Sequence, residues 1–225
     1  MGDLTVIYLT VNRVPQGWVD YHRKVLVEAI GDAKVITMSR LPTDFGVNIL
    51  QEAEESSSNI YYQMLRAARL IDTPYLAVAE DDVLYCHEHF NTFRPPMDSF
   101  GYNMTRWSLF SWGEPMYSWR NRLGNFALIA PTKLALEALE ERFTKYPTGT
   151  PLGNTGELGK VRMDRALRLT HHPVVEWWST VGIIQFSHDF GTEPFQRNHR
   201  KRMSMVRAYD IPYWGHAKEV QKQFA

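Results

Sequence analysis

The first 80 residues alternate between short apolar runs and longer amphipathic segments, and this alternation limits the fold more than any other feature. Residues 4–11, 33–38 and 75–79 are apolar runs of the kind found in buried strands. Residues 16–30 and 58–71 carry apolar side chains near helical spacing. The order strand, helix, strand, helix, strand predicts an α/β fold with a Rossmann-like, mostly parallel sheet flanked by helices.

The pattern changes beyond residue 95, where short apolar runs are separated by longer polar segments. We expect strands at 106–112, 125–130, 174–178 and 182–186, and helices at 132–145 and 160–169. Residues 39–48 are predicted to form a loop, because they contain Pro, Asp and Gly. Ser58 is the expected N-terminal cap of the second helix.

We predict one domain over residues 1–225. It has a nucleotide-binding half at 1–95, a smaller and mixed acceptor or catalytic half at 96–190, and a basic C-terminal tail at 191–225 that packs over the sheet.

The charge distribution, the cysteine content and the N-terminal segment indicate the kind of protein and its compartment. The net charge is zero, yet residues 1–96 carry eight Lys and Arg against thirteen Asp and Glu. One cysteine, Cys86, rules out an internal disulfide framework and suits a reducing compartment. The N-terminal apolar run lacks a basic region before it, so we expect no signal peptide and a cytoplasmic protein.

Polar residues follow two of the predicted parallel strands, at the edge where α/β sheets bind ligands. Thr10, Asn12 and Arg13 follow the first strand, and the carboxylates Glu80, Asp81 and Asp82 follow the third. Oxygen ligands in such a crevice suit Mg²⁺ or Mn²⁺, which commonly bridge to substrate phosphates. The competing interpretation of the three acids is a solvated turn after a strand.

The segment "NIYYQMLRAARLIDTPYLAVAEDD", residues 59–82, resembles the core signature of GT-A glycosyltransferases. In that family a helix and an apolar strand precede an acidic DXD motif that binds a metal ion and a nucleotide sugar. The resemblance implies that Asp82 is the metal ligand and that Glu80 contacts the ribose or the metal-bound water. Glu80 departs from the family pattern, in which Asp is commoner at this position.

Weaker similarities follow in the second half of the chain. "GNFALIAPTKLALEAL" is similar to the family's mid-domain strand and helix, and "RMDRALRL" resembles its later acidic segment. This implies Asp164 as the general base of an inverting enzyme, with Glu157 as the second choice. "GIIQFSHDFG" offers His188 as a second metal ligand. In a retaining enzyme Asp164 would position substrate instead, and the stereochemistry stays open.

The remaining contacts with the donor, expected to be a UDP-sugar, follow from position in the predicted sheet. Besides Glu80 and Asp81, the expected nucleotide-sugar ligands are Thr10, Asn12, Arg13, Asp44, Asn59 and Arg66. Asp44 follows the second strand, where a carboxylate can bind the base or ribose. Arg66 is predicted either to face the diphosphate or to lie on a solvated helix face.

The segment "FQRNHRKRMSMVR" carries five basic residues and no acid, and it includes Arg197, Arg200, Lys201 and Arg202. Such a strip suits phosphate binding. A compact glycosyltransferase with a basic strip resembles phage enzymes that glycosylate hydroxymethylated pyrimidines in DNA, which would act in the host cytoplasm. A protein or saccharide acceptor remains an alternative. So do a nucleotidyltransferase and a non-catalytic nucleic-acid-binding protein.

Overall fold

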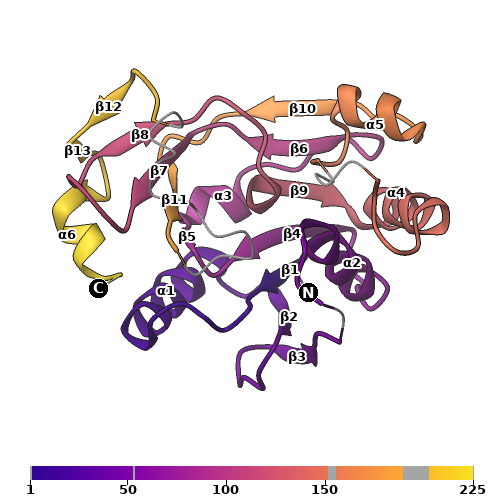
Figure 1. Ribbon diagram of the computed structural model, residues 1–225, viewed down its shortest axis with the longest axis horizontal. Helices are drawn as coiled ribbons and strands as arrows, with labels where there is room; N and C mark the ends of the chain where they lie inside the picture. Colours follow the sequence, from indigo (N-terminus) through magenta and orange to yellow (C-terminus); the bar gives the residue numbers. More distant parts are fainter. Residues whose placement is uncertain (1, 53, 152–155, 190–202, 225) are drawn as a thin grey trace.

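The computed structural model describes residues 2–52, 54–151, 156–189 and 203–224. A seven-stranded sheet forms its centre, in the order β10-β6-β9-β4-β1-β2-β3 (Figure 1). Its strands are β1 Leu4–Leu9, β2 Lys34–Ser39, β3 Val47–Leu50, β4 Tyr75–Glu80, β6 Phe100–Asn103, β9 Leu128–Pro131 and β10 Val174–Trp177. Only β9 runs against its neighbours β4 and β6, so the sheet is mostly parallel, as predicted.

Helices cover both faces of this sheet, and β1 is buried at every position. Alternate side chains of a strand point to opposite faces. Ile7 and Leu9 therefore pack with the helices α2 Ser57–Ala68 and α4 Thr132–Lys145, while Val6 and Tyr8 pack with α1 Gln16–Ile30. The short helices are α3 His87–Asn91, α5 Val161–Leu167 and the 3-10 helix η1 Asn125–Ala127. This arrangement is the predicted α/β fold.

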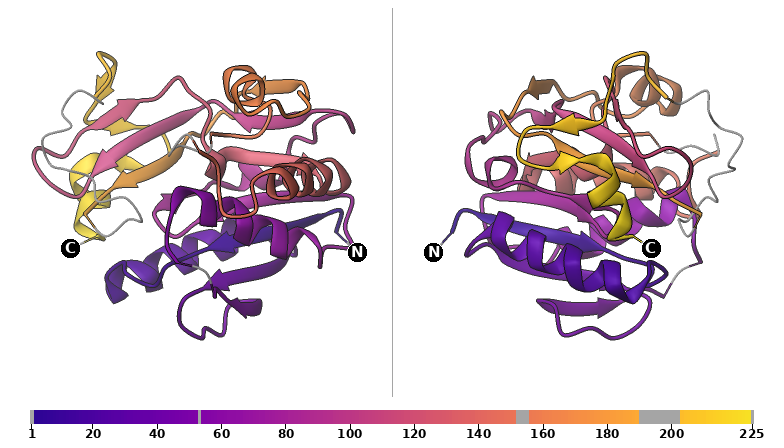
Figure 2. Two further views of the ribbon diagram at one scale, coloured as in Figure 1. Left: turned by 45° about the vertical axis from the view of Figure 1, so that its right-hand side comes forward. Right: turned by 90° about the vertical axis from the view of Figure 1, so that its left-hand side faces the viewer.

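A smaller sheet of mixed direction lies beside the large one, with the order β12-β8-β7-β11-β5. Its strands are β5 Val83–Leu84, β7 Arg106–Phe110, β8 Tyr117–Trp119, β11 Ile183–Ser187 and β12 Arg207–Ala208. The chain then forms β13 Asp210–Ile211, β14 Gly215–His216 and the helix α6 Ala217–Lys222. Trp18 of α1 packs against Phe186 and Phe224, so the C-terminal segment lies over α1 (Figure 2).

One local prediction was wrong, two were right only in part, and one strand was not predicted. The expected loop at 39–48 leads into the edge strand β3, which begins at Val47. The cap of α2 is Ser56, whose hydroxyl accepts from the backbone N–H of Asn59, and Ser58 lies inside the helix. The expected strand at 125–130 begins as η1. The sequence pattern also gave no sign of β6, which pairs with both β9 and β10.

Candidate active site

The acidic triplet lies at the junction of the two sheets. Glu80 ends β4, and the chain turns through Asp81 and Asp82 into β5. Because β5 pairs with β11, the backbone N–H of Phe186 donates to the carbonyl of Asp82 at 2.7 Å. His188 follows β11 and is thereby brought back to the end of β4. The large sheet supplies the acids, and the small sheet supplies the histidine.

Each of the first two acids is held by a neighbouring element. The Thr10 hydroxyl, after β1, donates to the carboxylate of Asp81, and the Trp18 indole donates to its backbone carbonyl at 2.7 Å. The side-chain amide of Asn125 lies 3.5 Å from a carboxylate oxygen of Glu80. The acidic turn is therefore a fixed part of the fold and not a solvated loop.

Asp82 differs from its neighbours because one of its oxygens lacks a partner. Its Oδ2 lies 3.7 Å from Nε2 of His188. Its Oδ1 is buried and has no hydrogen-bond partner in the part of the chain that the structure describes. Buried carboxylate oxygens are normally satisfied, so an unsatisfied one marks a place for an additional ligand.

Burial governs the electrostatics of this cluster. It raises the pKa of Glu80 to about 7 and that of Asp81 to about 6. It also raises the pKa of Asp82 well above the ordinary range, and the charges of Glu80 and Asp81 add to this effect. Burial lowers the pKa of His188 to about 4, which keeps its imidazole neutral and able to act as a metal ligand. A cation bound beside these carboxyls would favour their ionised form and lower their pKa values again.

These residues fit a divalent metal ion only in part. The unpartnered oxygen of Asp82 and the neutral imidazole of His188 are suitable donors for Mn²⁺. Among the described residues, no group of three or more His, Cys, Asp or Glu side chains is placed to hold a metal ion. Mg²⁺ and Mn²⁺ sites in phosphate-handling enzymes often use one or two protein ligands and complete their shell with phosphate oxygens and water. Asp82 and His188 could supply the protein part of such a shell.

A cavity of about 260 Å³ opens directly on these acids. It lies between the ends of β1 and β4 and the first turns of α2. Its polar lining residues are Thr10, Gln51, Glu55, Ser56, Ser57, Asn59, Gln63, Glu80, Asp81, Asp82 and His188. We call this cavity the cleft. A second cavity of about 490 Å³ adjoins it at Glu55, Ser56 and Asn59.

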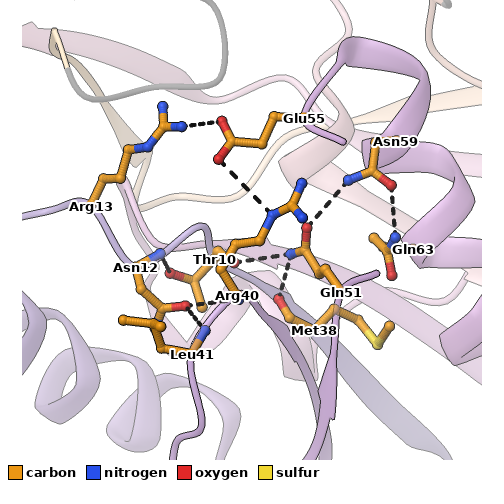
Figure 3. A network of polar contacts seen from close by, with 10 residues as sticks. All are labelled: Thr10, Asn12, Arg13, Met38, Arg40, Leu41, Gln51, Glu55, Asn59 and Gln63. Carbon is orange, nitrogen blue, oxygen red and sulfur yellow. Dashed lines mark hydrogen bonds and ion pairs between the residues drawn. The ribbon is translucent and has the colours of Figure 1, made fainter. Parts of the chain in front are cut away.

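The wall of the cleft is fixed by amide side chains (Figure 3). Asn12, in the left-handed region at φ 57°, accepts at its side-chain oxygen from the backbone N–H groups of Arg40 and Leu41, both at 2.9 Å. The Gln51 amide donates to the backbone carbonyls of Thr10 and Met38, both at 3.0 Å. These bonds tie the ends of β1 and β2 together. The backbone there is therefore organised before any ligand binds.

The predicted nucleotide ligands divide into two groups. Thr10, Asn59, Glu80 and Asp81 line the cleft, and Asn12 and Arg13 lie on the loop at its edge. Two others have different partners and do not line it. Asp44 is exposed and pairs with Arg23 at 2.7 Å. Arg66 donates to the Leu50 carbonyl at 3.0 Å and to the Gln63 side chain at 2.9 Å.

The two candidate bases lie in different surroundings. Asp164 on α5 is buried and accepts from, or donates to, Nδ1 of His171 at 3.0 Å, outside the lining of the cleft. Burial raises its pKa. Glu157 does not line the cleft either, but its charge adds, after burial and the charge of Asp81, to the raised pKa of Glu80. Its carboxylate also accepts from Lys160 at 2.8 Å.

The segment that carries Glu157 is closely packed. Gly156 and Gly159 both have positive φ, and a Cβ on either would clash with a neighbouring side chain. The buried Arg142 donates to the carbonyl of Gly156 at 3.2 Å, and Tyr102 donates to that of Leu158 at 2.9 Å. Residues 156–159 are therefore held in one backbone conformation.

Sequence reasoning did not identify several polar residues of the site. Gln51, Glu55, Ser56 and Gln63 line the cleft, and the spacing of Ser56, Asn59 and Gln63 along one helix face could have pointed to them. Arg106 begins β7 and does not line the cleft, and nothing in its local sequence indicates that it is buried. Burial lowers the pKa of Arg106 to about 9.

Four predicted acceptor or phosphate ligands, Arg197, Arg200, Lys201 and Arg202, lie outside the described residues. A search of the described helices found none that is long and apolar enough to cross a membrane.

Comparisons with known proteins identify no family. No family model matches the chain, and no curated protein matches it. Similar solved structures include the mannosyltransferase PcManGT from Pyrobaculum calidifontis in complex with GDP-Man and Mn²⁺, at 12% identity and a TM-score of 0.47. That match covers 81% of this chain and 56% of the mannosyltransferase, so this chain spans little more than half of that protein.

Two other similar structures come from different transferase classes. A glycosyltransferase involved in glycosylation of the major capsid of PBCV-1 shares 10% identity and a TM-score of 0.49, covering 82% of this chain and 92% of that one. The inositol-1-phosphate CTP transferase from T. maritima shares 8% identity and a TM-score of 0.48, covering 82% and 89%. At these levels of similarity the neighbours assign neither glycosyl nor nucleotidyl transfer to this chain.

Proposed function

We propose that this chain is a metal-dependent glycosyltransferase that moves a sugar from a nucleoside diphosphate sugar to an acceptor hydroxyl. The observation that carries the proposal is the buried Oδ1 of Asp82, which has no hydrogen-bond partner among the described residues; Asp82 follows β4 and lines the cleft. His188 lies beside it, and Glu80 and Asp81 share the same turn. A solvated turn would bury neither Oδ1 of Asp82 nor the side chain of His188.

Asp82 and His188 would hold Mn²⁺ or Mg²⁺. The ion would supply positive charge that stabilises the departing nucleoside diphosphate. Support comes from the donor atoms themselves: one carboxylate oxygen without a partner, and one imidazole kept neutral by burial.

The chain's own residues would bind and orient the donor. Thr10 and Asp81 meet at the end of β1, where a ribose or phosphate would lie in a sheet of this type. Glu80 is held beside Asn125, and its pKa of about 7 makes it either an acceptor or a donor of hydrogen bonds to a sugar hydroxyl near neutral pH.

Of the two candidate bases, Glu157 has the stronger support. Its charge contributes to the raised pKa of Glu80, whereas the charge of Asp164 does not, and closely packed glycines flank it in the chain. It would accept the proton of the acceptor hydroxyl as that oxygen attacks the anomeric carbon, a contribution typically worth about 10²–10⁴-fold in rate. Asp164 is engaged with His171 and would act at most through the packing of α5.

We keep hydroxymethylated pyrimidine in DNA as the proposed acceptor. The support is the basic composition of residues 197–207, which contain five Lys and Arg and no acid. A hydroxymethyl group supplies a primary hydroxyl, and the base would have to be exposed or flipped from the duplex. A UDP-sugar is the proposed donor.

The test is release of nucleoside diphosphate from a panel of UDP- and GDP-sugars with Mn²⁺ or Mg²⁺, first alone and then with hydroxymethylated or unmodified DNA. Asp82→Asn should abolish the metal-dependent release. The matched control is Asp72→Asn, which removes an exposed carboxylate that pairs with Lys34 near the amino ends of β2 and β4, at the opposite edge of the sheet from the cleft. Release of pyrophosphate from nucleoside triphosphates instead would establish nucleotidyl transfer. DNA binding that needs no metal, without turnover of either donor class, would indicate a non-catalytic binding protein.

A further inference from the structure

The carboxylate of Glu55 bridges two arginines at the edge of the cleft (Figure 3). One oxygen accepts from Arg13, on the loop after β1. The other lies 3.9 Å from Nε of Arg40, which directly follows β2. That distance is within ion-pair range but too long for a hydrogen bond. Two guanidinium groups therefore share one carboxylate, so one positive charge in this group is not balanced by Glu55.

Arg40 has unmet hydrogen-bonding capacity. Its Nε and Nη2 atoms are buried, and neither has a hydrogen-bond partner among the described residues. These two N–H groups lie on the same edge of the guanidinium, the fork that matches two oxygens of a phosphate or carboxylate. Buried charged donors without acceptors are costly, so this edge is poised to receive an anion.

The backbone beneath the two arginines is fixed, whereas their shared partner comes from a different segment. Asn12 lies on the loop that carries Arg13, and its side-chain oxygen accepts a hydrogen bond from the backbone N–H of Arg40. Glu55 belongs to the connection between β3 and α2. Exchanging the Glu55 carboxylate for another anion thus requires movement of one side chain and no change in the sheet.

Glu55 links Arg40 to the cleft. Glu55 lines both cavities, while Arg40 lines neither but contacts the Glu55 carboxylate. We therefore expect movement of the Glu55 side chain to open the Arg40 fork toward the cleft, which Thr10 and Asp81 also line.

We propose that Arg13 and Arg40 form an anion subsite for the phosphate groups of the nucleotide, and that Glu55 occupies this subsite until the nucleotide displaces it. The ligand class rests on the proposed function, but the subsite rests on the two arginines and their shared carboxylate. A diphosphate offers more oxygens and more charge than one carboxylate, and both unmet N–H groups of Arg40 then acquire acceptors. In this scheme the Glu55 carboxylate competes with the nucleotide phosphates for the two arginines, and this competition lowers the affinity of the protein for the nucleotide.

The experiment measures binding of UDP, GDP, inorganic pyrophosphate and uridine by calorimetry, in EDTA and at one fixed salt concentration. EDTA removes the contribution of any metal at Asp82. We expect Arg40→Gln to weaken diphosphate and pyrophosphate binding by about tenfold or more, from loss of charge-assisted hydrogen bonds. Uridine, which has no phosphate, should bind wild type and Arg40→Gln with equal affinity. Arg40→Lys keeps the charge but loses the fork, and should be intermediate.

Glu55→Gln should bind diphosphates roughly two- to fivefold more tightly, because a partly exposed ion pair no longer competes. Glu54→Gln is the matched control because it removes the same charge from the neighbouring residue. Glu54 is exposed and lines the second cavity. Arg23→Gln controls for loss of a cation, because Arg23 pairs with Asp44 away from the cleft. In an Arg40→Gln background, the gain from Glu55→Gln should be smaller, since part of the competition is gone.

The outcomes separate this proposal from the proposed function. If diphosphates bind the wild type but Glu55→Gln binds no more tightly than Glu54→Gln, the displacement proposal is overturned and sugar transfer stands. If the expected affinities appear but no nucleotide sugar is turned over, the anion subsite stands without the transferase. If neither the wild type nor Glu55→Gln binds any diphosphate at millimolar concentration, both proposals fail. Thermal unfolding of each variant confirms that it is folded.

Discussion

Replacing Asp81 by Asn should make the metal-free protein more stable at alkaline pH. Asp81 lies in the half-buried acidic turn, and desolvation raises its pKa from 3.8 to about 6. A raised carboxyl pKa means that the folded chain resists ionisation of this group more than the unfolded chain does. The fold therefore loses stability as the pH rises from below 4 to above 6, and the full loss is present at pH 8.

The magnitude follows from the two pKa values. At pH 8 both chains are ionised, and the difference corresponds to about 3 kcal/mol of lost stability. At pH 4 the unfolded chain is only partly ionised, and the loss is about 0.5 kcal/mol. Asn keeps an oxygen that can accept from Thr10, as the carboxylate now does, so the substitution removes the charge and retains the hydrogen bond.

The assay is urea unfolding of wild type and Asp81→Asn in EDTA, at pH 4 and pH 8. We expect a gain of about 2–3 kcal/mol at pH 8 that nearly disappears at pH 4. Asp72→Asn, at an exposed ion pair, should show no such gain. A stabilisation of equal size at both pH values, or none at pH 8, would refute the view that Asp81 is a buried charge held for a ligand.

Three further predictions concern the base, a buried histidine and the segment beside the site. Glu157→Gln should lower the rate of sugar transfer by about 10²-fold or more, whereas Asp164→Asn should change it much less; steady-state kinetics with equal losses would contradict this ranking. Burial lowers the pKa of His89 to about 3, so between pH 7.5 and pH 5 this histidine is protonated only in the unfolded chain. The free energy of unfolding should therefore fall by about 2 kcal/mol over this range. Urea unfolding of His89→Phe should lack this pH dependence. Gly156→Ala should destabilise the fold by about 1 kcal/mol or more, because φ is +68° and the new Cβ would meet Met163 at 2.4 Å; an unchanged melting temperature would exclude this strain.

The large sheet could be predicted in its first half and not in its second. The runs that form β1, β2 and β4 are continuous and apolar, because both faces of these strands are covered by helices. β3 and β6 have four residues each, and β6 contains Gly101, so neither produces a clear periodicity. Val174–Trp177 and Ile183–Ser187 look alike as short apolar runs, yet they join different sheets.

The candidate site shows the same division. Glu80, Asp81 and Asp82 follow a buried strand directly, and parallel strands align their carboxyl ends, so these acids and Thr10 were expected to meet. The bridge from Glu55 to Arg13 and Arg40 joins residues far apart in sequence, and nothing in the local pattern indicates it. Asp44 and Arg66 were expected at the site from sequence position, but their side chains bond to nearer partners.

Local sequence was sufficient for the helices and strands of residues 4–80, because hydrophobic periodicity is a property of neighbouring residues. It was also sufficient for the acidic turn, since any chain that leaves a buried parallel strand emerges at the ligand-binding edge. Only the tertiary structure decided that β11 pairs beside β5 and returns His188 to Asp82. It also decided which carboxylates became buried and unpartnered, because strand pairing and desolvation depend on residues a hundred positions apart in the chain.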